Sequence, residues 1–175
     1  MLDVPSNSDM SAYATKTDTV LETTLSRGRK ANTTIGEGSF AFGNDVEASG
    51  ENSYAFGVNA TAAGNCSFAE GRISVANGNY SHSEGVQTTA SGDASHVEGS
   101  VNTASGMISH AEGNGSRASG AVTHAEGYYT TASGSNSHSE GNKTVTSGSA
   151  SHAEGFYTIA NGYATRASGM FNIEQ

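Results

Sequence analysis

The chain is organised around a 14-residue repeat that occupies residues 32–171 in ten copies, without insertion or deletion. Clear copies are residues 88–101 (TTASGDASHVEGSV) and 102–115 (NTASGMISHAEGNG). A short, fixed period indicates stacked structural units, each of which buries its inner face against its neighbours. The repeat therefore predicts a solenoid, and the fold of one unit determines the fold of the rest.

Composition agrees with a solenoid and disagrees with a conventional globular core. The 175 residues include 23 Gly, one Pro and no Trp, and only 34% are hydrophobic. Such values approach those of disordered chains, but a disordered chain does not keep a strict register. A thin solenoid interior can be filled by Ala, Ser, Thr and Gly, so we expect one repetitive domain.

Charge and cysteine content exclude several classes of partner and scaffold. The formal net charge of -9 argues against nucleic acid or an anionic membrane as partner. Cys66 is the single cysteine, so no internal disulfide framework is expected. No stretch is apolar enough for membrane insertion, and the first residues (MLDVPSNSDMSAYAT) do not resemble a Sec signal peptide. Export as part of a larger protein remains open.

Within the repeat, Ala occupies position 3, Gly positions 5 and 12, His position 9 and Glu position 11. Small-x-Gly occurs twice per copy, seven residues apart, which divides the unit into two similar halves. Gly followed by two variable residues is typical of turns. Thr, Ser, Val and Ile between the turns favour short strands. The unit therefore predicts a flattened, all-β coil with two strands and two tight turns.

Alternation predicts which positions face the interior. The small residues at positions 1, 3, 5, 8, 10 and 12 are expected inside, where two strands of a narrow coil face each other. The outward positions 2 and 4 are mostly Thr and Ser. A threonine array that orders ice is one interpretation of this face, but Glu47, Val75, Arg117, Val145 and Ile159 interrupt it. We interpret it as an ordinary solvated sheet face.

The outward positions 9 and 11 form a second face, here named the 9/11 stripe. It begins with aromatic residues, continues as six His/Glu pairs and ends with Arg166. Repeated aromatics on an outward face are typical of a surface that meets a partner. The predicted assembly interface comprises Phe40, Phe42, Tyr54, Phe56, Phe68, Glu70, His82, Glu84, His96, Glu98, His110, Glu112, His124, Glu126, His138, Glu140, His152, Glu154 and Arg166.

The period, together with Ser-x-Ala-x-Gly at positions 8 to 12, resembles the head repeats of YadA-like trimeric adhesins over residues 32–171. The resemblance implies a left-handed parallel β-roll (solenoid), with three copies packed around a threefold axis through positions 9 and 11. The His/Glu variant is similar to repeats of bacteriophage and prophage tail-fibre or appendage proteins. It implies a homotrimeric structural or adhesive rod on a virion, or on the cell surface as part of a bacterial adhesin.

On a threefold axis, each layer of the stripe would bring three imidazoles and three carboxylates together. A His that donates one N–H to a neighbouring chain's Glu would offset the desolvation of the carboxylate. A metal-binding module is the alternative, since imidazole and carboxylate ligate zinc or nickel. Its candidate ligands are His82, His96, His110, His124, His138 and His152. Because the pair recurs in copy after copy, we expect no cofactor beyond an adventitious or axial ion.

No enzymatic site is expected. A general acid–base pair needs a pocket and a perturbed pKa, and a regular ladder by itself offers neither. The sequence contains no GxSxG, HExxH or phosphate-binding loop. A non-catalytic part of a polysaccharide-degrading tailspike is a further interpretation of a solenoid of this kind.

The variable turn positions 13 and 14 carry Tyr128, Tyr129, Phe156 and Tyr157. Exposed aromatics on turns can stack on a sugar ring, which makes them candidate contacts for a host-surface glycan or a protein receptor. Packing between subunits or coils is the alternative. Outside the repeat, residues 1–31 are expected to be partly flexible, with a capping strand near 18–25 that covers the first coil, and 172–175 form a C-terminal tail.

Overall fold

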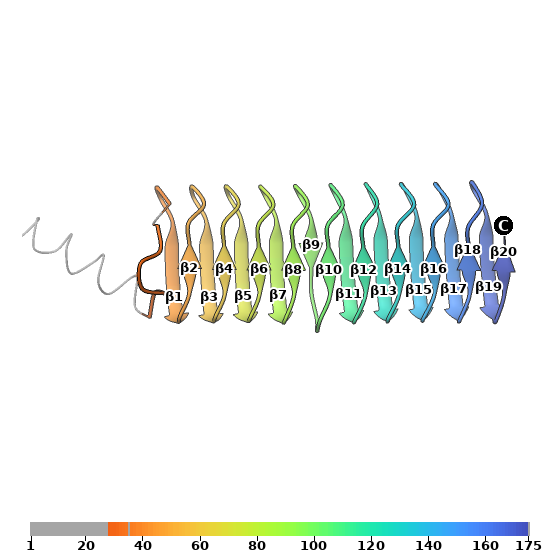
Figure 1. Ribbon diagram of the computed structural model, residues 1–175, viewed down its shortest axis with the longest axis horizontal. Coiled ribbons are helices and arrows are strands. Elements are labelled where there is room, and N and C mark those ends of the chain that lie inside the picture. Colours follow the sequence, from red (N-terminus) through yellow and green to blue (C-terminus); the bar gives the residue numbers. More distant parts are fainter. Residues whose placement is uncertain (1–27, 35, 175) are drawn as a thin grey trace, which may run out of the picture.

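The structure, a computed structural model, describes residues 28–34 and 36–174, so the capping strand expected near 18–25 lies outside the described residues. The described part of the chain is all-β. It contains no helix that could cross a membrane. Its strands form successive coils of a parallel β-solenoid, stacked along the long axis of the molecule (Figure 1). The predicted fold class, a solenoid of 14-residue coils, is confirmed.

The solenoid consists of two ten-stranded parallel sheets. One sheet contains the longer strands β1 (Phe40–Asn44), β3 (Tyr54–Val58), β5 (Phe68–Arg72), β7 (His82–Val86), β9 (His96–Val97), β11 (His110–Asn114), β13 (His124–Tyr128), β15 (His138–Asn142), β17 (His152–Phe156) and β19 (Arg166–Met170). The other contains β2 (Glu47–Ala48), β4 (Thr61–Ala62), β6 (Val75–Ala76), β8 (Thr89–Ala90), β10 (Thr103–Ala104), β12 (Arg117–Ala118), β14 (Thr131–Ala132), β16 (Val145–Thr146), β18 (Ile159–Ala160) and β20 (Ile173–Glu174). Each strand pairs with the equivalent residues of the next coil, as Phe40 does with Tyr54.

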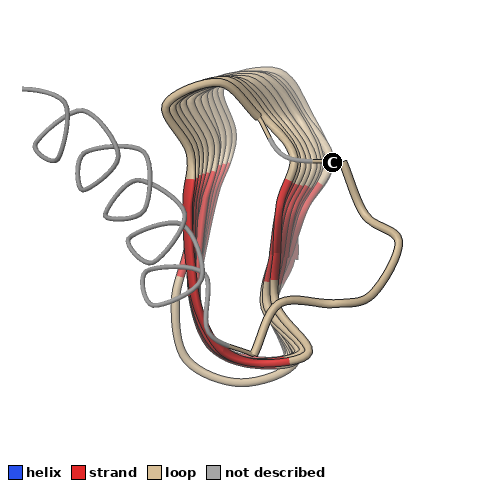
Figure 2. Cartoon of the chain, turned by 90° about the vertical axis from the view of Figure 1, so that its left-hand side faces the viewer, coloured by secondary structure: helices blue, strands red, loops and turns tan. Residues whose placement is uncertain are grey.

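The two strands of a coil differ in length, whereas the sequence predicted two similar halves. The strand at positions 2 and 3 ends early because two amides, those of Ser49 and Gly50, donate to the same Ala62 carbonyl at 2.9 and 3.2 Å. A carbonyl shared by consecutive amides bends the backbone away from the sheet. The end-on view in Figure 2 shows the result, with two facing strands joined by loops around a thin interior.

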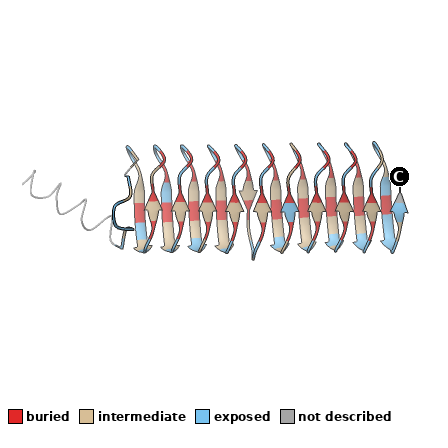
Figure 3. Ribbon diagram, in the orientation of Figure 1, coloured by how far each residue is buried: buried red, intermediate tan, exposed pale blue. Residues whose placement is uncertain are grey.

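Small side chains fill this interior, as predicted for positions 1, 3, 5, 8 and 10. Ala55, Ala62 and Ser53 have no exposed surface, and Val97 is among the largest of the fully buried side chains. Figure 3 shows the buried residues as a band that recurs from coil to coil. The prediction was wrong for position 12, where glycines such as Gly71 are exposed. The long strand turns outward there with a positive φ, which takes the glycine off the inner face.

Hydroxyl groups in the interior lock the turns. The Ser53 Oγ donates to the Gly50 carbonyl at 2.7 Å, and the Ser109 Oγ donates to the Gly106 carbonyl at 2.6 Å. A buried hydroxyl is costly unless it is hydrogen-bonded. The serines at position 8 therefore hold the turn at position 5 while they fill space, which explains how a core with few hydrophobic side chains remains stable.

Residues other than glycine adopt left-handed conformations at positions 7 and 14. Examples are Asn52 (φ 52°), Asn59 (φ 55°) and the β-branched Val122 (φ 56°), for which this region is strained. In this conformation the amide of Asn52 donates to the Glu37 carbonyl of the preceding coil at 2.7 Å. Both turns thus keep a hydrogen bond between coils. In the turns the amide donates to the preceding coil, whereas in the strands the amide donates to the next coil.

Pairing extends beyond both predicted boundaries of the repeat. Arg29 bridges to Val46, which lies 17 rather than 14 residues further on, and its Nη2 donates to the Ala48 carbonyl at 2.9 Å. At the other end, β20 pairs with β18 and adds a strand past residue 171. The sheet of short strands therefore extends past the C-terminal boundary of the repeat, whereas at the N-terminal end Arg29 adds only an isolated bridge.

Candidate functional site

The 9/11 stripe lies on the outer face of the long-stranded sheet. In-register pairing aligns His110 with His124 and Glu112 with Glu126. Successive strands of a sheet lie about 4.8 Å apart, so equivalent side chains form columns. The stripe residues are half-buried for most of its length, with Phe42, Tyr54 and Arg166 more exposed.

The imidazoles form a continuous stack. The ring centroids of His82 and His96 are 4.8 Å apart with an interplanar angle of 8°, and those of His124 and His138 are 4.7 Å apart at 3°. Phe68 stacks on His82 at 4.9 Å and 14°. The aromatic section therefore passes into the histidine section without a break, and phenylalanine and histidine are interchangeable in this column.

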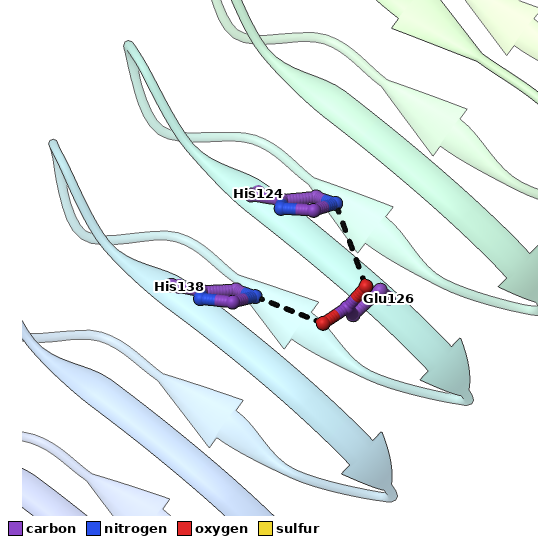
Figure 4. A group of neighbouring side chains, drawn as sticks. All are labelled: His124, Glu126 and His138. Atoms are coloured by element: carbon purple, nitrogen blue, oxygen red, sulfur yellow. Dashed lines mark ion pairs between the residues drawn. The ribbon is translucent and has the colours of Figure 1, made fainter.

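Each histidine meets a glutamate of the preceding coil. The Nε2–Oε1 distances are 3.5 Å for His82–Glu70, 3.9 Å for His96–Glu84, 3.5 Å for His110–Glu98, 3.3 Å for His124–Glu112, 3.3 Å for His138–Glu126 and 3.2 Å for His152–Glu140. Figure 4 shows Glu126 beside the stacked rings of His124 and His138, with an ion pair to each. The groups that were expected to pair across chains thus already pair within one chain.

This offset pairing was missed at the level of sequence, although a signal for it exists. The glutamate column begins at Glu70, one coil before His82, and the cationic column ends at Arg166, one coil after His152. Arg166 donates to Glu154 Oε1 at 3.0 Å. Each glutamate from Glu70 to Glu154 is therefore followed, one coil later, by an imidazole or guanidinium.

The fit between imidazoles and carboxylates is incomplete. Only two of the six contacts, His124–Glu112 and His152–Glu140, have hydrogen-bond geometry. The buried Nε2 atoms of the other four rings have no hydrogen-bond partner within the described residues; these rings are His82, His96, His110 and His138. A buried polar atom without a partner costs free energy, so these four nitrogens are the least satisfied polar groups of the stripe.

The carboxylates affect one another. A hydrogen bond with Glu112, burial and a hydrogen bond with Glu140 raise the pKa of Glu126 to about 7. The hydrogen bond with Glu126 lowers the pKa of both Glu112 and Glu140. Near neutral pH the central carboxyl of these three therefore holds a proton that its neighbours accept. An open groove of about 400 Å³ beside them is lined by Glu112, Gly113, Glu126, Gly127, Glu140 and Gly141.

Burial and neighbouring imidazoles lower the pKa of two rings. For His110 the cause is burial, followed by His124 and His96. For His138 it is burial, followed by His124 and His152. Both rings are therefore neutral at pH 7, and their protonation at lower pH brings like charges to within a stacking distance.

We expect His110 and His138 to reduce thermal stability as the pH is lowered from 7 to 5, measured in the Glu126→Gln background because Glu126 acts in the opposite direction over the same range. A folded-state pKa below the unfolded value of about 6.5 means that the unfolded state binds more protons just below pH 6.5. Stability that is present above pH 6.5 is therefore lost on acidification through the lowered pKa values of His110 and His138. The variant His110→Phe/His138→Phe should lose less, because Phe68 already stacks in this column. Circular dichroism melts at several pH values measure the difference.

Glu126 acts with the opposite sign and serves as the control. Its raised pKa stabilises the folded state at low pH, and this contribution is lost as the pH rises from about 4.3 towards 7. The Glu126→Gln variant should therefore gain more in Tm at pH 8 than at pH 5. If the Tm of the Glu126→Gln variant does not fall between pH 7 and pH 5, the role given to the two histidines is contradicted.

The aromatic residues at positions 13 and 14 form a ledge along one edge. Tyr128 contacts Tyr129 edge-on at 4.6 Å, Phe156 contacts Tyr157 in the same way, and Tyr157 stacks on Phe171 at 5.5 Å. All five rings remain exposed. The rings therefore pack on one another within the chain and still present surface to solvent, and their contact with a receptor stays a prediction.

Comparison with known families finds the YadA head domain repeat in two places, at residues 48–72 and 125–151. The first match includes β3, β4 and β5 in the aromatic section, and the second includes β14, β15 and β16 in the His/Glu section. No curated protein matches the chain. The two sections share one coil geometry, so the change from aromatic to His/Glu pairs alters the stripe and not the repeat. The chain therefore contains two copies of the YadA head domain repeat, one in each section of the solenoid.

Proposed function

We propose that the chain is a homotrimeric, rod-like structural and adhesive segment of a phage-like tail fibre or a bacterial surface adhesin, displayed on a virion or at the cell surface. The observation that carries this proposal is the unbroken 9/11 stripe. It runs along one face of the described solenoid, and its aromatic end leaves Phe42 and Tyr54 about half exposed.

An exposed apolar stripe on a rigid rod favours association with a second rigid surface. Identical chains offer identical stripes with the same 14-residue register, so they can match coil with coil in a closed, symmetric assembly. YadA-type head repeats support threefold symmetry for that assembly. The His/Glu section would then give the interface a polar, specific segment beyond the apolar one.

Sedimentation equilibrium at neutral pH tests the assembly, with an expected mass about three times the 17.7 kDa of one chain. The variant Tyr54→His/Phe56→Glu gives the second coil the pair that six later coils use, so the solenoid is preserved. We expect it to weaken association at least about 10-fold, the effect of about 1.4 kcal/mol.

The matched control is Tyr80→Glu, which adds a charge at a turn residue that is 70% exposed and lies off the stripe. This control should associate like the wild type. A wild-type mass of one chain, or unchanged association of the Tyr54→His/Phe56→Glu variant, would refute the assembly role of the stripe.

For the adhesive role we propose the aromatic ledge as the contact for a host-surface glycan or protein receptor. Tyr128 and Tyr129 are 46% and 52% exposed, and Lys143 Nζ lies 4.8 Å from the centre of the Tyr157 ring. Paired aromatic faces beside a cation suit the apolar faces of sugar rings. Tyr129→Ala/Tyr157→Ala should lower binding to a panel of bacterial surface glycans, with unchanged sedimentation. Equal binding by the variant would exclude the ledge as the contact.

A further inference from the structure

Four groups of three side chains along the 9/11 stripe bring His nitrogens and Glu oxygens within 4.8 Å of one another. They are Glu70/His82/Glu84, Glu98/His110/Glu112, His124/Glu126/His138 and Glu140/His152/Glu154. No residue belongs to two groups, and His96 belongs to none. The regular ladder is therefore divided into separate clusters, each of which spans two neighbouring coils.

The first two groups differ from the fourth in their hydrogen bonding. The Nε2 atoms of His82 and His110 are buried and have no partner in the described residues. In the fourth group, His152 is hydrogen-bonded to Glu140, and Arg166 binds Glu154.

The third group is unsuitable for another reason. Its rings, His124 and His138, stack 4.7 Å apart at 3°, so their nitrogen lone pairs run parallel instead of converging.

We propose that Glu70/His82/Glu84 and Glu98/His110/Glu112 each bind one first-row divalent transition-metal ion, through one imidazole nitrogen and two carboxylate oxygens. Water completes the coordination on the open side. All three ligands of each ion belong to one chain. Each site can therefore form without the proposed trimer, although it lies on the 9/11 stripe through which the chains are proposed to pack.

The distances within these groups fit two ligands of one ion better than a hydrogen bond. In both groups His Nε2 lies 3.5 Å from the Oε1 of the preceding glutamate, beyond the 2.7–3.2 Å or so of an N–H···O bond. Two ligand atoms at about 2.0–2.1 Å from a tetrahedral zinc ion lie about 3.3 Å apart. An ion between Nε2 and the carboxylates would supply the missing partner with little movement of the side chains.

Charge favours a cation at these positions, because each group places two carboxylate oxygens and one imidazole nitrogen within 4.8 Å of one another on one chain. A dication would neutralise two adjacent carboxylates in each group.

Access and spacing also agree with two ions. Glycine at position 12 leaves the carboxylate column uncovered on one side, as at the exposed Gly71 and Gly113. The two groups begin two coils apart, which separates the ions by about 9.6 Å at 4.8 Å per strand. Ions in adjacent coils would lie at half that distance and repel each other strongly.

A set of one imidazole and two carboxylates suits Zn²⁺, Co²⁺ or Ni²⁺, whereas Ca²⁺ and Mg²⁺ prefer oxygen alone.

The experiment uses the full chain, purified without an affinity tag and treated with a chelator. Calorimetric titration with Zn²⁺ at pH 7.5 should give two ions per chain, and Co²⁺ should develop the visible absorption of low-symmetry coordination. His82→Phe and His110→Phe should each remove one ion, and the double variant should remove both. Phenylalanine is suitable because Phe68 occupies the same column and stacks on His82.

The matched control is His96→Phe. His96 lies in the same column and its Nε2 is also buried without a partner, but it is 3.9 Å from Glu84 and belongs to no group. This variant should still bind two Zn²⁺. The proposal is overturned if the wild type binds no Zn²⁺ or Co²⁺, if the double variant binds as many ions as the wild type, or if His96→Phe loses as many as His110→Phe. Two ions on a monomeric chain would support the sites while removing the trimer.

Discussion

Replacing Gly85 with alanine is expected to destabilise the solenoid by more than about 4 kcal/mol, in the range of the most damaging single substitutions. Gly85 has φ +104°, and a Cβ added to it would lie 2.1 Å from the carbonyl oxygen of Gly99 in the next coil. That oxygen accepts the amide of Val86 at 2.9 Å and cannot move without breaking the inter-coil ladder. The substitution therefore combines backbone strain with a clash that propagates along the stack.

Gly169 is the matched control, because it occupies the same repeat position in the last copy. It has φ +98°, and a Cβ added there meets nothing within 4 Å. Gly169→Ala should therefore carry the backbone strain alone, about 1–3 kcal/mol. For a chain of this size each kcal/mol lowers Tm by about 2–4 °C. Similar losses of Tm in the two variants would show that stacking clearance is not what requires glycine at position 12.

Asn102→Leu is expected to cost about 2–6 kcal/mol, although it exchanges one buried side chain for another of similar size. Asn102 has no exposed surface, and its amide donates to the carbonyls of Glu98 at 2.6 Å and Gly113 at 2.8 Å. Its Oδ1 accepts the amide of Ser116 at 2.7 Å. Gly113 keeps the amide of Ser100 as a donor, but Glu98 and Ser116 lose the bonds made by Asn102. Each buried group left unpaired costs about 1–3 kcal/mol.

The Asn102→Thr variant tests whether the loss of stability comes from the lost hydrogen bonds or from any substitution at this position. Thr88 and Thr130 occupy the same column in neighbouring coils and are fully buried. In the equivalent position, Thr158 Oγ1 donates to the Glu154 carbonyl four residues earlier at 3.1 Å. The threonine variant should therefore keep the bond to Glu98 and lose only the one from the Ser116 amide, at a cost of about 1–3 kcal/mol. Urea unfolding of both variants measures the difference, and equal losses would contradict this account.

Asn102 also shows where a repeat alone is insufficient to predict structure. Its position is occupied by Ala, Ser or Thr in most copies, and from the sequence it reads as an inward polar residue without a special role. In the structure its side-chain amide donates to the carbonyl of Glu98, the residue directly after the end of β9 at Val97. The side chain satisfies backbone groups that the ladder leaves unpaired, and those groups can be identified only when the coils are stacked.

The period alone determined the architecture of this protein. A parallel stack of equal coils allows one register, so 14-residue spacing places like residues in columns and sends small residues inward. The family resemblance and the 9/11 stripe follow from the same spacing. The order of glutamate, histidine and arginine along the chain even contains the one-coil offset of the pairs.

Only the tertiary structure decided which atoms meet. The offset pairing of each imidazole with the preceding carboxylate depends on side-chain reach across 4.8 Å of stacking, which the sequence does not encode explicitly. The sequence also does not show the positive φ at position 12, the shortness of the strand at positions 2 and 3, or the buried nitrogens of His82 and His110. These features arise because neighbouring coils compete for the same hydrogen bonds and the same space. Columns are a property of the period, whereas contacts within and between them are a property of packing.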